Sequence, residues 1–501
     1  MTNRLATSFI ALSTAFAAPA LADVSAADVW SNQQALYNSV GATLSGDLSD
    51  GQLNNPEINV ILPQGIASLQ IKAETVSMTE NGDGTVTITY PSPMTVSFAG
   101  AAGDEGSFSA TGTMTHDGYT VIASGEPGDI SYTSDGQNLR FDINDVAVEA
   151  SGDVPEMEVE GFVSLTQWTG TSRVTEGNLI GYTTSSTVGV TEAEFTFDID
   201  NVTSRSTQVT QPLTSQLEAS FPIGGSDMMN LSAALRNGLS LVVTSTGDGN
   251  SSITETFVDG EVLNTQNTST GAQTFEASFT EDGLAMNGEA SDFAVIMNDP
   301  LVFPGDLEFG IGALTMDYDV PLNASEEPQD FRMATGLIDV TMGDTIWNMI
   351  DPSGQLPRDP AEITFDVTGL GTNGMDLLDI TAMTQLFGPP PIQIDEVTIE
   401  NLRIAAVGAE ATATGAMTFD WTDFQTIPGI ARPEGAVTVN LNGANALMDK
   451  LVSMGLIPEE ELMMPRMMMG MFATPVGDDM LETVLEVNEE GHVLANGQRL
   501  Q

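Results

Sequence analysis

With 501 residues, 70 acidic side chains against 13 basic ones and a formal net charge of −57, the chain is both long and strongly acidic. So few cations cannot form a basic patch, which excludes nucleic acid binding and charge-driven attachment to anionic lipid head groups. Hydrophobic residues make up 41% of the chain and cysteine is absent, so the composition excludes a disordered chain and a disulfide framework.

The acidity admits two explanations. One is solubility in salty surroundings, where counter-ions screen the repulsion between carboxylates. The other is divalent-cation binding, which would make this an acidic cation-binding structural protein. The acids are dispersed along the chain rather than set at the spacing of metal ligands, which favours the first explanation.

Residues 1–22 have the features of a secretory signal peptide. Arg4 supplies the positive start, residues 9–18 the apolar centre, and residues 20–22 the small side chains of a cleavage site. This predicts cleavage after Ala22 and a periplasmic protein. Because no later stretch is long and apolar enough to span a bilayer, the sequence predicts no transmembrane segment.

The mature chain is predicted to open with a helix that Ser25 caps, with Asp28 three residues later and Gly41 at its end. Trp30 and Tyr37 share one of its faces. A neighbouring face is apolar and carries Val29, Leu36 and Val40. The sequence therefore predicts an amphipathic helix that docks on the strands that follow.

Region 58–320 alternates apolar and polar residues, as is typical of strands with one water-facing side. Sequential hairpins in this region predict antiparallel meanders, and one helical interruption is predicted at 228–237. The hairpin turns are expected at the Asp-Gly pairs, which stand at 83–84, 117–118, 135–136, 248–249, 259–260 and 282–283.

The polar stretch 321–330 predicts a soft boundary between an N-terminal region at 23–325 and a C-terminal region at 326–501. The second region is expected to contain strands at 333–342, 362–368 and 392–421 and short helices at 345–350 and 375–387. Its closing part is expected to contain a strand at 436–441, two helices and a final hairpin at 481–495. In the first of these helices the apolar stripe consists of Ala444, Leu447, Met448, Leu451 and Val452. Pro458 opens the second.

These elements predict a mainly β (α+β) fold. Large antiparallel twisted sheets would be built from hairpin meanders, with a few short docked helices and a helical hairpin near the C-terminus. Sheets of this size must close over themselves, pack on a second sheet, or curve into a trough. A sandwich would have an ordinary core, whereas a trough would leave a dry groove for a lipid chain, and the sequence leaves both open.

Two motifs are candidates for ligand chemistry. The glycine-rich run 369–374 lies between a predicted strand and a predicted helix, with Asp395 further on, as in dinucleotide-binding turns. Its antiparallel surroundings argue against that site. The methionines of 463–471 could hold Cu(I) through their thioethers. A packing stripe is the simpler interpretation, because one helical face carries Met464, Met467, Met468, Met471 and Phe472.

Few residues are candidates for catalysis. The histidines are His116 and His492, and both are expected to be exposed beside hairpin turns. Cysteine and the common nucleophile, metalloprotease and P-loop motifs are absent, and the turn at 81–84 lacks the rest of a calcium loop. No catalytic, cofactor-binding or metal-binding residue is therefore predicted. A carboxylate pair among 70 acids leaves open a hydrolase acting on an envelope polymer.

Six short runs in the C-terminal part form a recognisable set: Ile399-Glu400-Asn401-Leu402-Arg403, Gly408-Ala409-Glu410, Gly415-Ala416-Met417-Thr418-Phe419-Asp420, Arg432-Pro433-Glu434-Gly435, Asn445-Ala446-Leu447-Met448-Asp449-Lys450-Leu451 and Gly491-His492-Val493-Leu494-Ala495-Asn496-Gly497. Together they resemble an uncharacterised exported bacterial family, domain of unknown function family 2125. That resemblance implies no activity and no catalytic residues. The long β stretches with sparse helices are similar, at the level of the fold, to AsmA-like envelope proteins, although no N-terminal membrane anchor is predicted here.

The sequence thus predicts a non-enzymatic periplasmic protein of envelope maintenance. Its expected partner is an apolar ligand such as a lipid, or an envelope protein. The hydrolase and the cation-binding structural protein are the alternatives.

Overall fold

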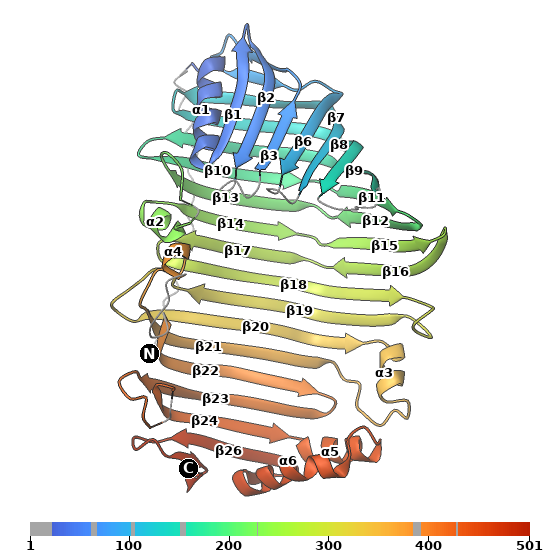
Figure 1. Ribbon diagram of the computed structural model, residues 1–501, viewed down its shortest axis with the longest axis vertical. Coiled ribbons are helices and arrows are strands. Elements are labelled where there is room, and N and C mark those ends of the chain that lie inside the picture. The colour runs from blue at the N-terminus through green and yellow to red at the C-terminus, as the bar shows by residue number, and fades with distance from the viewer. Residues whose placement is uncertain are drawn as a thin grey trace.

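The computed structural model describes residues 23–61, 68–101, 106–150, 157–227, 229–383, 392–426 and 429–500. The predicted signal peptide at 1–22 lies outside the described residues. Within them, all strands belong to one antiparallel sheet that runs the length of the molecule (Figure 1). This confirms the predicted mainly β fold of meanders with few helices.

The sheet folds over itself at its N-terminal end. This end contains α1 (Ala26–Ser39), β1 (Ala42–Ser49), β2 (Gln52–Ile61), β3 (Ser68–Ala73), β4 (Val76–Glu80), β5 (Val86–Thr89), β6 (Met94–Ala101) and β7 (Gly106–Glu126). One ladder runs from β2 through β3 and β6 to β7, and another from β2 through β4 and β5 to β7. Because both ladders end on β7, strands β1–β6 form a front layer over the strands that follow (Figure 1).

The next part of the sheet is built in rows. Strands β8 (Asp129–Ala150) and β9 (Met157–Glu176) are long, and the two halves of β9 pair with different strands, β10 and β11. Each following row has two shorter strands, and both columns rejoin on β18. The strands of the rows are β10 (Leu179–Val188), β11 (Thr191–Ile199), β12 (Val202–Thr210), β13 (Leu213–Pro222), β14 (Ser240–Gly247), β15 (Asn250–Val258), β16 (Glu261–Thr270) and β17 (Gln273–Thr280).

From β18 onward the sheet is a simple meander with the helices at its ends. Its strands are β18 (Gly283–Asn298), β19 (Leu307–Val320), β20 (Gln329–Met342), β21 (Ala361–Asn373), β22 (Ile392–Ala406), β23 (Ala409–Asp420), β24 (Arg432–Asn442), β25 (Thr474–Gly477), β26 (Met480–Val487), β27 (Val493–Ala495) and β28 (Gln498–Arg499). The stretch proposed as a domain boundary connects β19 to β20, which pair with each other. The division into 23–325 and 326–501 stays a prediction.

The opening helix has the predicted cap. The hydroxyl of Ser25 accepts a hydrogen bond from the Asp28 N–H at 3.2 Å, and the Asp28 carboxylate accepts one from the Ser25 N–H at 2.9 Å. These reciprocal bonds form a capping box, in which two backbone donors at the helix start are satisfied. The Ser25 hydroxyl also donates to the Asp28 carboxylate, and this bond, together with the one from the Ser25 N–H, holds the pKa of Asp28 below its usual value.

The other described helices are α2 (Leu231–Arg236), α3 (Asp344–Ile350), α4 (Ile380–Met383), α5 (Ala444–Ser453) and α6 (Glu459–Phe472). The predictions of 228–237 for α2 and 375–387 for α4 were too long, and 384–387 lie outside the described residues. Backbone groups before α4 bond to other segments instead: the Leu377 N–H donates to Leu322, and Leu378 accepts from Leu231. These bonds satisfy the groups that a longer helix would have used.

Three of the Asp-Gly pairs do not form hairpin turns. Residues 117–118 lie inside β7 and residues 135–136 inside β8, while 248–249 connect β14 to β15 within one row. The pair Asp259-Gly260 does turn a hairpin, between β15 and β16, with both φ angles positive. Inside the long strands the ladder is instead irregular, with register shifts around Asp117.

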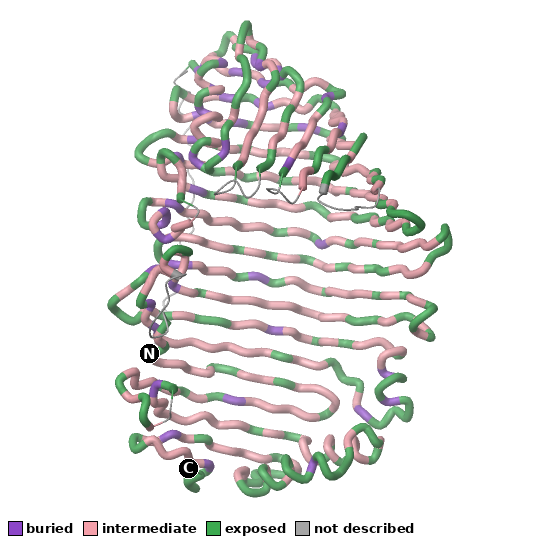
Figure 2. The backbone as a smooth tube through the Cα atoms, in the orientation of Figure 1, coloured by how far each residue is buried: buried purple, intermediate pink, exposed green. Residues whose placement is uncertain are grey.

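The larger cluster of buried hydrophobic residues lies at the N-terminal end of the molecule. It lies between α1 and strands β4, β5 and β7–β10, with Val29, Val86, Ile130 and Val174 fully buried. A second, smaller cluster surrounds Leu235 of α2. Within strands β14 to β24, by contrast, Ala413 is the one hydrophobic residue that is buried, and most residues are intermediate or exposed (Figure 2). Within the described residues, most of the sheet therefore has no layer packed against it.

Candidate binding groove

One face of the sheet is apolar across ten neighbouring strands, β14, β17–β24 and β26. Residues directly opposite each other in an antiparallel pair point to the same side, so the register assigns every side chain to a face. One line of such partners crosses five strands and consists of Met286, Tyr318, Met333, Val367 and Ile399. Parallel lines add further hydrophobic residues, which together we call the apolar face. Its other members are Leu241, Val243, Phe275, Phe279, Leu284, Leu314, Met316, Val320, Leu337, Ile363, Phe365, Val397, Leu402, Ile404, Met417, Val437, Val439, Leu441, Leu481 and Leu485.

The alternation of apolar and polar residues changes phase in the middle of these strands. Asp292 in β18 and Asp339 in β20 have φ angles of +50° and +55°, and neither residue is paired with β19, although the register is the same on both sides of each. Leu284 and Met286 before Asp292 alternate in one phase, and Phe293 after it begins the other. The alternation of apolar and polar residues changes phase at the residue where the backbone conformation changes. Both halves of the strand therefore keep hydrophobic side chains on one side.

The opposite face is charged. Arg332 bonds to Asp317 and Asp366, each at 3.0 Å, on strands β20, β19 and β21. Arg403 of β22 pairs with Glu410 at 2.7 Å and also with Glu362. These ion pairs join adjacent strands on the side away from the apolar face, where water solvates them.

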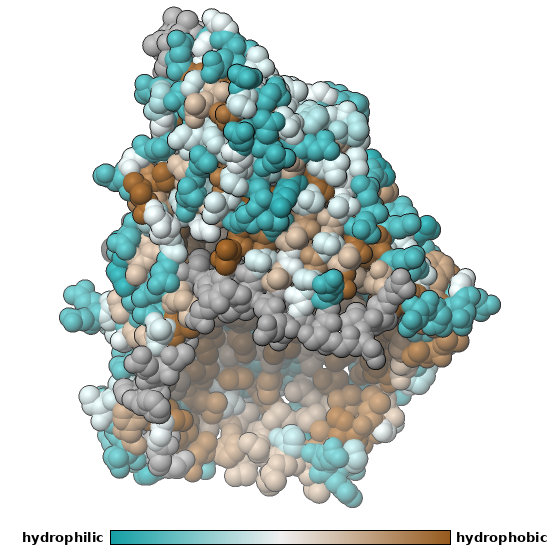
Figure 3. Space-filling model, turned by 45° about the horizontal axis from the view of Figure 1, so that its top comes forward, coloured by the Kyte–Doolittle hydropathy of each residue, from teal (hydrophilic) through white to brown (hydrophobic). Residues whose placement is uncertain are grey.

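The apolar face is hollowed rather than flat. Figure 3 shows a concave region below the N-terminal part, lined mainly by hydrophobic residues. We call this concave part of the apolar face the groove. Several side chains of the apolar face are only partly covered by the described residues; Ile363 is 45% exposed and Ile404 47% exposed.

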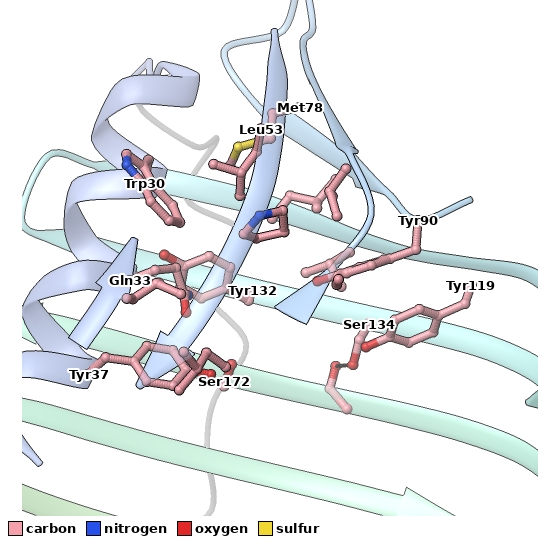
Figure 4. A pocket seen from close by; sticks show the side chains of 18 of the residues that line it. Trp30, Gln33, Tyr37, Leu53, Met78, Tyr90, Tyr119, Tyr132, Ser134 and Ser172 are labelled. Atoms are coloured by element: carbon pink, nitrogen blue, oxygen red, sulfur yellow. Dashed lines mark hydrogen bonds between the residues drawn. The ribbon is translucent and has the colours of Figure 1, made fainter. Parts of the chain in front are cut away.

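On the same side of the sheet, an aromatic cavity of about 380 Å³ lies beneath α1 (Figure 4). Five of the six tyrosines and two of the four tryptophans of the chain line it: Tyr37, Tyr90, Tyr119, Tyr132, Tyr182, Trp30 and Trp168. A line of cross-strand partners connects the cavity to the groove through Tyr132, Ser172, Thr184, Leu217 and Val243. The cavity and the groove therefore lie on the same side of the sheet.

Hydrogen bonds fix one wall of the cavity. The Tyr132 hydroxyl donates to the Asn32 side chain at 2.7 Å, and the Asn32 amide donates to Glu176 at 2.8 Å. The Trp168 indole N–H donates to Ser134 at 2.9 Å. Burial raises the pKa of Tyr132 to about 12, so its hydroxyl stays protonated in neutral solution. No charged residue lines the cavity among the residues that the structure describes.

The glycine-rich run 369–374 does not form a nucleotide-binding turn. Strand β21 continues through Asn373, so the glycines lie within a strand that pairs with β22. A Cβ on Gly369 would collide with the backbone oxygen of Glu396 in β22 and with the ring of Phe331, so this glycine permits close approach of the neighbouring strands. Asp395 accepts a hydrogen bond from Thr372 at 2.9 Å across the two strands. The motif is part of the sheet.

The methionine stripe of α6 was predicted to pack, and this prediction is wrong. Its four methionines, Met464, Met467, Met468 and Met471, are 50–60% exposed, and the neighbouring Met463 is 64% exposed. Leu462 is the buried residue of this helix. Metal binding by these thioethers stays untested. Among the residues described, no group of three or more His, Asp or Glu side chains is placed to hold a metal ion.

The two histidines are not brought together. His116 lies in β7, where its Nδ1 accepts a hydrogen bond from the Tyr119 N–H at 2.9 Å, so the expectation of an exposed, unpaired side chain was wrong for it. His492 follows β26 at the other end of the sheet, and its N–H donates to Asn488. They form no catalytic pair.

The sequence matches no known family model and no curated protein. The resemblance to domain of unknown function family 2125 stays a prediction. Across the described parts of the chain, every helix is too short or too polar to cross a membrane.

Proposed function

We propose that this protein binds a lipid acyl chain, or a chemically similar long apolar chain, along the groove. The observation that carries the proposal is the uncovered apolar face, which extends over ten strands with almost no buried side chain. Monomeric proteins rarely expose contiguous apolar patches of more than a few hundred Å², and larger ones mark binding sites.

The shape of the groove suits a long and flexible occupant. At about 4.8 Å between strands, ten strands extend over roughly 43 Å, which exceeds the hydrocarbon thickness of a bilayer at about 30 Å. Covering apolar surface stabilises the complex by about 25 cal/mol per Å². Burial of an acyl chain requires no charged partner, which agrees with a groove lined by Leu, Ile, Val, Met and Phe side chains.

The charge distribution supports handling of chains rather than attachment to a membrane. Carboxylates and ion pairs cover the opposite face, and the chain carries −57 in total. An anionic bilayer surface would repel this protein. We therefore propose a non-enzymatic protein that holds single lipid molecules during envelope maintenance, in the periplasm to which the predicted signal peptide would export it.

Native mass spectrometry of protein purified without detergent tests this proposal. We expect bound lipid, recovered by solvent extraction and identified, and saturable uptake of a fluorescent fatty acid by the stripped protein. A folded protein that carries no lipid and takes up no acyl probe would contradict the proposal and leave partner binding to be pursued.

A further inference from the structure

The aromatic cavity has one wall whose polar side chains are buried and hydrogen-bonded to each other. Asn32 is fully buried and Tyr132 is 5% exposed, and the two are hydrogen-bonded to each other. The Asn32 side chain accepts a hydrogen bond from the Tyr132 hydroxyl and so fixes the orientation of the ring, and its amide donates to Glu176. This rigid wall faces an opening around which Figure 4 shows Tyr37, Tyr90 and Tyr119.

Several hydroxyls of the cavity have no hydrogen-bond partner in the described part of the chain. Tyr37, Tyr90, Tyr119 and Tyr182 line the cavity, and none of their phenol groups bonds to another protein group there. Burial raises the pKa of Tyr37, Tyr90 and Tyr119, which keeps these groups neutral donors. Half-buried hydroxyls without partners favour a ligand that can bond to them.

The cavity selects against charged ligands. None of its lining residues is Lys, Arg or His, so a phosphate or carboxylate would lose its hydration without gaining a counter-charge. A quaternary ammonium group could meet the ring faces, but it cannot accept or donate the hydrogen bonds that the hydroxyls offer. Hydroxyl groups of a ligand can do both.

We infer that the aromatic cavity holds the uncharged, hydroxyl-bearing head group of a lipid, such as a glycerol or a sugar, while the acyl chains of that lipid lie in the groove. The inference rests on the proposed function, since the line of partners from Tyr132 to Val243 places the cavity and the groove on the same side of the sheet. The volume of about 380 Å³ lies within the usual range of small-ligand pockets and is large enough for one head group.

Competition between lipids with identical acyl chains tests the inference on the full mature protein. A fluorescent acyl probe is displaced by diacylglycerol, monoglycosyl diacylglycerol, phosphatidylglycerol or phosphatidylcholine. We expect the two uncharged lipids to displace the probe at concentrations at least tenfold lower than phosphatidylglycerol. Tyr37→Phe and Tyr182→Phe, which each remove a single oxygen, should reduce this preference by about two- to tenfold.

Ser131→Ala is the matched control, because it also removes a single oxygen and Ser131, the neighbour of Tyr132 in β8, points to the opposite face of the sheet. It should leave the preference between head groups unchanged. Equal displacement by all four lipids, or preference for phosphatidylcholine, would overturn the inference while leaving the groove as an acyl-chain site. Failure of the probe itself to bind would instead overturn the proposed function.

Discussion

Asn32 is the residue through which α1 is held to the sheet by buried polar bonds. Replacing it with alanine leaves the Tyr132 hydroxyl and the Glu176 carboxylate without their partner. We expect Asn32→Ala to lower the free energy of unfolding by about 1–3 kcal/mol. Chemical denaturation followed by tryptophan fluorescence measures this loss. Asn38→Ala, on the exposed side of the same helix, should change it by less than about 0.5 kcal/mol; equal losses would show that the buried bonds contribute nothing.

Adjacent residues of β21 provide a test of the groove. Ile363 belongs to the apolar face, whereas Thr364 points to the charged face and lies opposite Arg403. A carboxylate at Ile363 can stay hydrated in the empty protein but would be desolvated beneath an acyl chain. Ile363→Asp should therefore weaken binding of an acyl probe at least tenfold, and Thr364→Asp should leave it unchanged. Similar affinities for both variants would place the ligand elsewhere.

At the scale of single residues, the sequence predicted contacts between residues close together in the chain. It did not predict which residues from distant elements meet in the fold. Ser25 and Asp28 were identified as a cap because the signal lies within four residues of sequence. The tyrosines of the cavity come from α1, β7, β8, β10 and the residue that follows β5, and they meet only through the register of the sheet. The sequence contained one indication of the aromatic cavity, because five of the six tyrosines precede residue 183.

Helix α6 offers a prediction at the scale of an element. Leu462 is its buried residue, while Met467 and Met471 are 54% and 56% exposed. Leu462→Ala should lower the free energy of unfolding by about 2–5 kcal/mol. Met467→Ser with Met471→Ser should change it by less than about 0.5 kcal/mol, because exposed side chains contribute little. Thermal melts of the three proteins decide this, and a large loss from the methionine pair would mean that the stripe is covered in solution.

The same helix shows what the spacing of apolar residues in a sequence can and cannot predict. The spacing correctly placed α6 and its methionine stripe on one helical face, but it does not specify whether another element covers that face. The strands behave alike: their alternation predicted one apolar side, as found in β20 and β21. A sandwich and an open groove have the same local pattern, so the sequence could not decide between them.

At the scale of the whole molecule, the charge predicts a response to salt. Thirteen basic residues cannot pair with 70 acidic ones, so most carboxylates repel one another. Raising the ionic strength screens this repulsion, and we expect the melting temperature to rise from low salt to about 0.5 M. The surface ion pairs weaken in parallel, but each contributes only about 0.2–1 kcal/mol. A melting temperature that falls with salt would show that the ion pairs dominate.

The uneven distribution of the core predicts uneven stability. Two layers and α1 bury the N-terminal end, whereas each strand from β18 to β26 contacts little more than its neighbours in the meander. A quasi-one-dimensional array of this kind opens segment by segment, and regions without buried contacts open at the lowest free energy. In the empty protein, backbone amides of β18–β24 should therefore exchange with solvent faster than those of β7–β10.

Binding of a lipid chain should change this difference in amide exchange along the sheet, because a ligand that binds only the folded groove stabilises the strands that form it. Hydrogen exchange measured by mass spectrometry on stripped and lipid-loaded protein gives both profiles. We expect lipid to slow exchange in β18–β24 by at least tenfold and to leave β7, which lies in the buried core, nearly unchanged. Ile363→Asp, loaded in the same way, should keep the profile of the empty protein. Uniform protection along the sheet without lipid would mean that the apolar face is already covered in solution.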